Sequence, residues 1–295
     1  LMGLGLVIAF AAATMDVALD ALSTSSVLPR HRAMAGGLKV ASLAVGSIVG
    51  GGIFVALAGR LGWAATFQLC AGVSAVATLP ILLNRQWDRP IDGTYSPRPD
   101  LLAIVRDPEM RGKMIRLTLA SCVMVTLFFF NRIMLVDLGV PVRTIGWLVG
   151  TGAPICGLVS ALAAVPTLRR MGASNGILIF TAICLVACVA MGIGAWRNEP
   201  ALAIAGAIIV AAGTNGFFAI ICAATLGWAR GAQPATDYAV LYGVSRLVAT
   251  LVAIAIARVA ALIGWPLFYA GAACGLVVMS LVVRNAFADS RPTGT

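Results

Sequence analysis

Two carboxylates in an apolar segment are the first residues with types and spacing suited to chemistry. Asp16 and Asp20 lie four residues apart, near the end of an apolar run that begins at residue 1. At that spacing both side chains fall on one face of an α-helix. Inside a membrane helix an Asp costs about 2.5–3.5 kcal/mol, and it is retained where it meets a wet cavity or a cation. Both residues are therefore candidates for handling a substrate or a proton; the alternative is a structural ion pair between helices.

A lysine follows in the next apolar run. Lys39 comes just after Gly36 and Gly37. If the two helices are antiparallel neighbours, Lys39 lies at the level of Asp20. It is then either an ion partner of the carboxylates or a lysine that snorkels to the membrane surface.

Asn131 and Arg132 interrupt a later apolar run. Arg132 could snorkel outward. It could equally line a cavity and attract an anionic group, because a guanidinium suits bidentate carboxylate binding.

A polar stripe is predicted near the C-terminal end. Asp237 precedes Tyr238, Tyr242 and Arg246, and the last three follow at i, i+4 and i+8 on one helix face. The stripe either lines a cavity or serves packing and interface anchoring. Thr214 and Asn215 are weaker candidates.

The composition predicts an integral membrane protein. The chain has 295 residues, of which 60% are hydrophobic and 11% charged, with a mean hydropathy of +0.98, whereas soluble domains carry about 25% charged residues. A spanning helix needs about 20 apolar residues. The sequence predicts an all-α fold with nine such helices, at 1–27, 36–58, 62–83, 114–136, 144–167, 173–195, 200–228, 237–262 and 264–284.

The basic residues between these helices alternate in number. By the positive-inside rule the richer side is cytoplasmic, which also places the C-terminus in the cytoplasm. That side would hold fourteen basic residues: Arg30, Arg32, Arg85, Arg89, Arg98, Arg106, Arg111, Lys113, Arg116, Arg169, Arg170, Arg230, Arg284 and Arg291. The other side would hold Arg60, Arg143 and Arg197, with Arg258 near a helix end.

A weak internal repeat predicts the domain organisation. Gly62-Trp63 and Gly264-Trp265 open two helices 202 residues apart, an offset of six helices. A six-plus-six parallel repeat is the arrangement of major facilitator transporters. We therefore expect 1–84 to be the remainder of an N-terminal bundle, 85–112 a cytoplasmic linker with a short amphipathic helix near Leu101–Arg106, and 113–295 a C-terminal six-helix bundle. The nine helices would correspond to helices four to twelve of a twelve-helix protein, with three preceding helices missing.

The sequence gives little support to an enzymatic, metal-binding or nucleic-acid-binding function. The seven cysteines lie in apolar runs without paired CxxC spacing, and the single histidine, His31, lies between two arginines. No nucleophile–base pair, metal cluster or nucleotide loop is visible, so neither an enzyme nor a metal or other cofactor is predicted. The placement of the net charge of +10 in short loops argues against nucleic acid as a partner.

Short motifs carry a family resemblance. Residues 13–20, Ala-Thr-Met-Asp-Val-Ala-Leu-Asp, resemble the "ATQD" signature of AmpG-type permeases, with Met15 where the signature has Gln. Residues 50–52 with 60–67, and 136–139 with 145–148, look similar to the same group of the major facilitator superfamily, which includes muropeptide, acetyl-CoA and siderophore permeases. Residues 235–238, Ala-Thr-Asp-Tyr, resemble the pyochelin- and rhizobactin-type siderophore permeases in particular.

The resemblance implies a secondary transporter of the bacterial inner membrane. It would move a bulky polar solute, siderophore-like or muropeptide-like, by alternating access between two bundles. Protons are a further candidate partner, through Asp16 or Asp20. The rival hypothesis is a non-transporting, truncated membrane protein that acts as a sensor or assembly partner.

Overall fold

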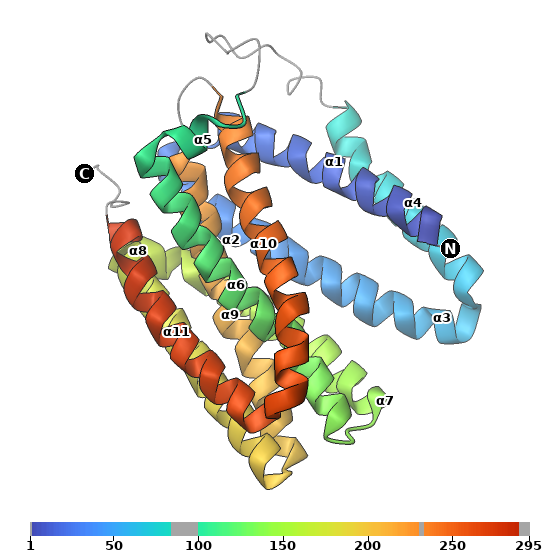
Figure 1. Cartoon of the computed structure of the whole chain (residues 1–295). Helices are drawn as coiled ribbons and strands as arrows, with labels where there is room; N and C mark the ends of the chain where they lie inside the picture. The colour runs from blue at the N-terminus through green and yellow to red at the C-terminus, as the bar shows by residue number, and fades with distance from the viewer. Residues whose placement is uncertain (1, 84–99, 230–232, 289–295) are drawn as a thin grey trace.

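A computed structural model describes residues 2–83, 100–229 and 233–288, and these residues form helices and their connections, with no strand among them (Figure 1). In a bilayer every backbone polar group must be paired internally, which a helix achieves within one segment. Eight continuous helical stretches in the described residues are long and apolar enough to cross a membrane. The predicted all-α membrane fold is therefore confirmed.

The N-terminal helices form three long rods. They are α1 (Met2–Ser26), the continuous stretch of α2 (Arg32–Ser47), the π-helical η2 (Ile48–Phe54) and α3 (Val55–Leu61), and then α4 (Trp63–Leu83), with the short η1 (Pro29–His31) before α2. The sequence predicted the second rod over 36–58, so the observed rod begins four residues earlier, at Arg32.

The C-terminal bundle contains the longer and better packed helices. It consists of α5 (Ala103–Arg106), α6 (Pro108–Asp137), α7 (Val142–Thr144), the π-helical η4 (Ile145–Val149), α8 (Gly150–Arg197), α9 (Pro200–Trp228), α10 (Pro234–Ile263) and α11 (Trp265–Ala288). Prolines stand in the first turn of α6, α9 and α10, where the missing N–H has no intrahelical partner to lose. The Asp107 side chain also accepts a 2.9 Å hydrogen bond from the Glu109 backbone N–H, which caps α6.

The longest helical stretch is broken at a glycine. Gly172 has φ 80° and ψ 167°, a left-handed conformation that interrupts α8. Glycine adopts this conformation without a Cβ clash. The break divides the stretch into two antiparallel segments, as the predicted helices 144–167 and 173–195 require, and it gives nine spanning segments in the described residues.

The two ends of the molecule can be named from its turns. The end with η1, Gly172 and the start of α10 is called the Gly172 end, and the end with Gly62, Asn198 and Gly264 is called the Gly264 end. The two repeat glycines have almost the same backbone geometry: φ 80° and ψ 162° at Gly62, φ 78° and ψ 163° at Gly264. Each is followed by a helix that begins with Trp, but Gly172, which lies outside the repeat, has nearly the same geometry, so the turn is not specific to the two repeat positions.

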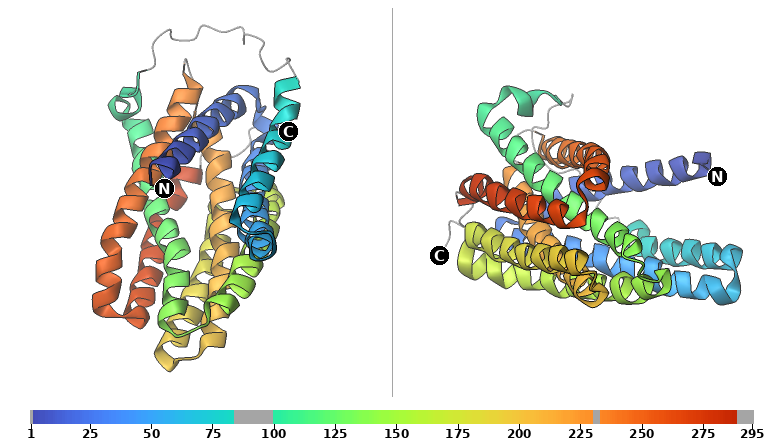
Figure 2. Two further views of the ribbon diagram at one scale, coloured as in Figure 1. Left: turned by 90° about the vertical axis from the view of Figure 1, so that its right-hand side faces the viewer. Right: turned by 60° about the horizontal axis from the view of Figure 1, so that its bottom comes forward.

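The hydrophobic core lies mainly within the C-terminal bundle. There α8 packs on α9 and α11, and α6 packs on α10. Fully buried side chains such as Met124, Ile177 and Phe217 fill the space between them. The N-terminal helices reach this bundle chiefly through α2, which packs on α8 and α9, and through the contact of α1 with α10, while α4 projects away (Figure 2).

Small residues allow α2 to approach its neighbours closely. A Cβ placed on Gly36 would lie 2.5 Å from the Ala219 carbonyl oxygen of α9. A Cβ on Gly37 would lie 2.5 Å from Val165 Cγ2 of α8. Such close backbone approach is typical of helix packing in membranes.

Part of the predicted linker lies outside the described residues. Residues 84–99 are not described, and neither are Arg230 and Arg291 of the basic set. The described part contains α5, which falls inside the predicted Leu101–Arg106 helix. The helix predicted from residue 114 begins at Pro108, because Asp107 and Pro108 supply a cap and a first turn.

Candidate functional site

Lys39 joins three helices near the Gly172 end. Its Nζ forms an ion pair with the Asp20 carboxylate of α1 and donates a 3.1 Å hydrogen bond to the Tyr238 hydroxyl of α10. The same Nζ lies 5.1 Å from the Tyr238 ring centroid and 5.0 Å from the Tyr242 ring centroid, within cation–π range. Asp20, Lys39, Tyr238 and Tyr242 are called the Lys39 cluster below.

The Lys39 cluster is largely shielded from solvent. The Asp20 and Lys39 side chains are 13% and 29% exposed, and Tyr238 is fully buried. Of the two sequence hypotheses for Lys39, the geometry matches the ion partner of Asp20 and not a side chain extended to the surface. The cluster ties both α1 and α2 to α10.

The predicted stripe on α10 exists. The rings of Tyr238 and Tyr242 stack at a centroid distance of 5.8 Å and an interplanar angle of 16°. Arg246, one turn further along, donates hydrogen bonds of 3.3 and 3.2 Å from Nε and Nη2 to the Tyr242 hydroxyl. Its guanidinium carbon lies 4.4 Å from the ring centroid of Phe218 on α9. The stripe thus runs from the Lys39 cluster to the Arg246 guanidinium, which contacts the neutral Tyr242 hydroxyl and the Phe218 ring.

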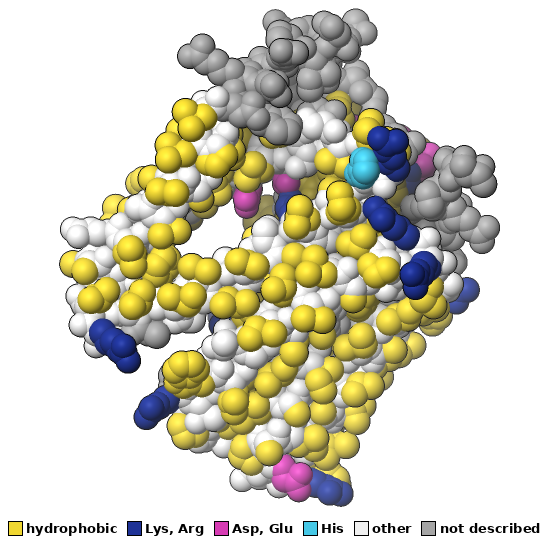
Figure 3. Space-filling model, turned by 180° about the vertical axis from the view of Figure 1, so that it is seen from behind, with side chains coloured by type: hydrophobic (Ala, Val, Ile, Leu, Met, Phe, Trp, Pro, Cys, Tyr) yellow, Lys and Arg dark blue, Asp and Glu magenta, His cyan; other side chains and the backbone are white. Residues whose placement is uncertain are grey.

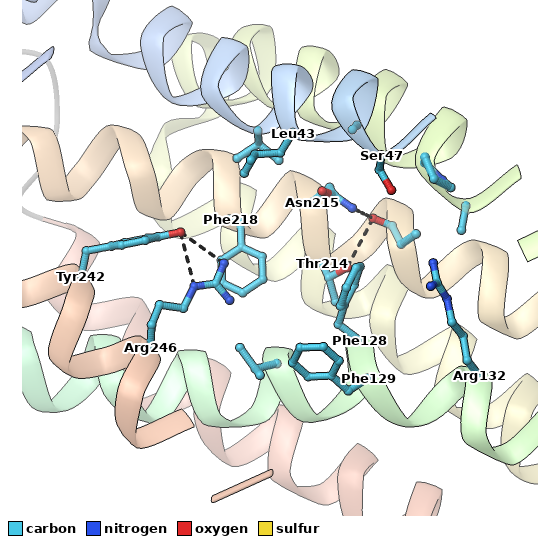
Figure 4. A pocket seen from close by; sticks show the side chains of 16 residues that line it. Leu43, Ser47, Phe128, Phe129, Arg132, Thr214, Asn215, Phe218, Tyr242 and Arg246 are labelled. Atoms are coloured by element: carbon cyan, nitrogen blue, oxygen red, sulfur yellow. Dashed lines mark hydrogen bonds between the residues drawn. The ribbon is translucent and has the colours of Figure 1, made fainter. Parts of the chain in front are cut away.

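Arg246 lines a pocket with a volume of about 300 Å³ (Figure 4). The pocket lies between α2, α6, the first half of α8, α9 and α10. Its lining is Val40, Leu43, Ala44, Ser47, Val125, Phe128, Phe129, Arg132, Ala153, Pro154, Ala211, Thr214, Asn215, Phe218, Tyr242 and Arg246. Figure 4 shows Arg246 and Arg132 at opposite ends, with Phe128, Phe129 and Thr214 between them.

The structure separates Asn131 from Arg132. Consecutive helical residues point about 100° apart, so the two side chains cannot share a direction. Arg132 is exposed and lines the pocket, whereas Asn131 is buried and donates to the carbonyl oxygens of Leu127 and Phe128 at 3.3 and 2.9 Å. Its Oδ1 atom has no hydrogen-bond partner among the described residues.

Two predicted acidic residues lie away from the pocket and the Lys39 cluster. Asp16 is exposed on α1, one turn before Asp20. Asp237 is buried in the first turn of α10, where the helix dipole favours a negative charge. The Gln233 side chain donates to Asp237 at 3.4 Å and also binds the backbone of Asp100, so this group fastens the start of α10 to the segment before α5.

Several lining residues were not predicted as site residues. Phe128 and Phe129 precede Arg132 by four and three residues, so helical spacing alone could have placed them beside it. Phe218 and Ser47 come from other helices, and only the tertiary packing brings them to the pocket. Thr214 and Asn215, the weaker candidates, do line it.

Metal chemistry gains no support from the described residues. They contain no group of three or more His, Cys, Asp and Glu side chains placed to hold a metal ion. All seven cysteines are free thiols.

A comparison with protein families gives one match. The model of the Major Facilitator Superfamily matches residues 1–136. The matched segment contains the three N-terminal rods and nearly all of α6, a little less than half of the chain. It therefore includes Asp16, Asp20, Lys39, Asn131 and Arg132, while the α10 stripe lies beyond it.

Proposed function

We propose that the protein is a secondary transporter of the major facilitator type and that its solute passes through the pocket. The observation that carries this proposal is that the pocket is lined by helices from both parts of the chain. Helix α2 belongs to the N-terminal helices, while α6, α8, α9 and α10 belong to the C-terminal bundle. In such transporters the solute binds between two bundles that rock about it.

The Lys39 cluster suits the role of a gate at one end of that pathway. It joins α1 and α2 to α10 at the Gly172 end. Rocking of the bundles requires the Lys39–Tyr238 contact to break and re-form, because Lys39 belongs to α2 of the N-terminal helices and Tyr238 to α10 of the C-terminal bundle. The Asp20–Lys39 ion pair lies within the N-terminal helices and can travel with them.

The proposed solute is siderophore-like, with a muropeptide-like solute as the alternative. The pocket volume of about 300 Å³ is at the lower end of the 300–1,000 Å³ range of ligand pockets. A compact solute fits this volume better than a sugar–peptide conjugate does.

Proton coupling is proposed at Asp20 in preference to Asp16. Asp20 is bound to Lys39, so protonation of its carboxylate would release a cation that also contacts Tyr238. Asp16 is exposed and has no such link to the C-terminal bundle. We further propose that the chain lies in the bacterial inner membrane with the Gly172 end and the C-terminus in the cytoplasm, because the basic residues gather at that end.

The test is uptake into liposomes that contain the full chain. Ferric pyochelin and a labelled muropeptide are offered with and without an inward proton gradient. We expect uptake of ferric pyochelin that rises with the gradient and falls at least tenfold in Arg246→Gln. The matched control is Arg258→Gln, because Arg258 is an exposed residue of the same helix outside the pocket.

A folded chain that moves neither solute would contradict transport and favour the sensor or assembly role. Uptake of the muropeptide alone would replace the proposed solute. Uptake in Asp20→Asn that keeps its full dependence on the gradient would remove Asp20 as the coupling residue.

A further inference from the structure

The charges of the pocket are unbalanced. Arg132 and Arg246 line it, and none of the described acidic residues does. Neither guanidinium takes part in any of the ion pairs of the described residues, which join Lys39 to Asp20, Arg106 to Asp100 and Lys113 to Glu109. The third nearby cation, Lys39, is already matched by Asp20. Within the part of the chain that the structure describes, the pocket therefore presents two positive charges without a counter-charge.

Arg246 is held in place by groups that do not neutralise it. The Tyr242 hydroxyl accepts two of its hydrogen bonds, and the Phe218 ring lies 4.4 Å from its guanidinium carbon. These contacts orient the guanidinium and leave other N–H donors available, because arginine carries five. An oriented guanidinium with spare donors is suited to bind a carboxylate in a bidentate manner.

Arg132 places a second positive charge at the other end of the pocket. Figure 4 shows it across the pocket from Arg246, with aromatic side chains in the space between. Phe128 and Phe129 of α6 and Phe218 of α9 give this space apolar walls. Such walls favour a flat, apolar or aromatic body.

We propose that the pocket binds a compact organic dianion, with one acid group at Arg246, the other at Arg132 and an apolar or aromatic body against the phenylalanines. This proposal takes from the proposed function only that the pocket is the solute site. A neutral or cationic solute would leave both guanidinium groups without a counter-charge, whereas a dianion supplies one to each.

The test is a binding measurement that does not depend on transport. The full chain is purified into lipid nanodiscs, and calorimetry follows three ligands with one ring system: naphthalene-2,6-dicarboxylate, 2-naphthoate and 2-naphthamide. We expect the dicarboxylate to bind at least tenfold more tightly than the monocarboxylate, and the monocarboxylate at least tenfold more tightly than the amide. Each tenfold step corresponds to about 1.4 kcal/mol.

Variants then assign the charges to residues. Arg246→Gln and Arg132→Gln should each bring the dicarboxylate to about the affinity of the monocarboxylate in the wild type. Arg258→Gln, outside the pocket, should leave all three affinities unchanged. Arg246→Lys should keep part of the gain, because it retains the charge and loses the fork of donors.

The proposal is overturned if the amide binds as tightly as the dicarboxylate, if no ligand binds, or if Arg258→Gln weakens binding as much as Arg246→Gln does. The ligand comparison on the wild type needs no variant to fold. Tight binding of the dicarboxylate without uptake of any solute would keep this inference and refute transport. Uptake restricted to neutral or cationic solutes would refute this inference and keep the proposal of transport.

Discussion

The outlying N-terminal helices α1 and α4 and the central helices of the C-terminal bundle are all apolar but very differently packed. In the most hydropathic windows of α1 and α4, 6% of the residues are buried, against 56% in α6 and 78% in α9, while the α2 stretch and α10 have 19% and 17%. The space-filling view shows an opening between the projecting N-terminal helices and the rest of the molecule, with charged side chains at its edge (Figure 3). Hydropathy thus indicates which segments enter the membrane, and small residues and polar contacts decide which of them pack together.

Helix α2 is the main structural link between the two regions. It contributes the close glycine contacts, the lysine of the Lys39 cluster and one wall of the pocket. The predictions below test that link, beginning with its backbone contacts.

The largest effect is expected from Gly36→Val. The new Cβ would lie 2.5 Å from the Ala219 carbonyl oxygen and 2.7 Å from the Ala223 backbone nitrogen, and backbone atoms of α9 cannot easily move. We expect a loss of about 3 kcal/mol, the upper end of the range for overpacking. Thermal unfolding in detergent, followed by size-exclusion chromatography, measures the change.

The matched control is Gly46→Val on the same helix, where a Cβ would meet nothing within 4 Å. Equal destabilisation by the two substitutions would show that α2 is sensitive to valine itself and not to its contact with α9.

The next largest effect is expected from Asp20→Asn. It removes the carboxylate and leaves the Lys39 ammonium, with a side chain 29% exposed, without its counter-charge. Breaking a fully buried pair costs about 3–5 kcal/mol; because this pair is partly exposed, we expect about 2 kcal/mol. A double-mutant cycle compares the free energies of unfolding of the wild type, Asp20→Asn, Lys39→Met and the variant with both substitutions.

In that cycle the double variant should be more stable than the sum of the single losses predicts. Strict additivity would mean that the ion pair does not stabilise the contact between α1 and α2.

A smaller effect is expected from Tyr238→Phe. The ring and its stacking on Tyr242 remain, and the hydroxyl that accepts the 3.1 Å hydrogen bond from Lys39 is lost. We expect about 1 kcal/mol, typical of one hydrogen bond. Since this bond joins the N-terminal helices to α10, Tyr238→Phe should also speed maleimide labelling of Ala239→Cys in a chain whose seven native cysteines are replaced by alanine. Unchanged labelling would argue against a gate at Tyr238.

The smallest effect is expected from Asp16→Asn. Asp16 is exposed, and no hydrogen bond or ion pair of its side chain occurs among the described contacts. Exposed substitutions of this kind usually change stability by less than about 0.5 kcal/mol. Unfolding measurements should show no difference from the wild type, and a loss similar to that of Asp20→Asn would make the two carboxylates equivalent.

The spanning helices could be predicted because each is a long apolar run closed by basic, Gly or Pro residues. The predicted helix 200–228 agrees with Pro200–Trp228 at both ends. The π-helical segments Ile48–Phe54 and Ile145–Val149 could not be predicted. An extra residue in a turn shifts the phase of an amphipathic pattern, but these segments contain no polar residue that would reveal the shift.

The candidate site could be predicted in part. The stripe of Tyr238, Tyr242 and Arg246 follows from helical spacing, and the pairing of Lys39 with Asp20 follows from antiparallel neighbours. The position of Phe218 over Arg246 depends on how α9 packs on α10, which no local pattern contains. Adjacency in sequence suggests a shared role for Asn131 and Arg132, but the turn of the helix separates their side chains.

Tyr242 has a consequence for the energetics of the whole molecule. Its ring faces Lys39, and its hydroxyl holds Arg246. A ligand that draws Arg246 away from this hydroxyl and thereby moves the Tyr242 ring changes the free energy of the ring's contact with Lys39. That coupling is reciprocal, so the factor by which ligand binding loosens the Lys39 contact equals the factor by which the intact contact weakens ligand binding. The coupling free energy is thus one quantity, which can be measured either from ligand binding or from the Lys39 contact.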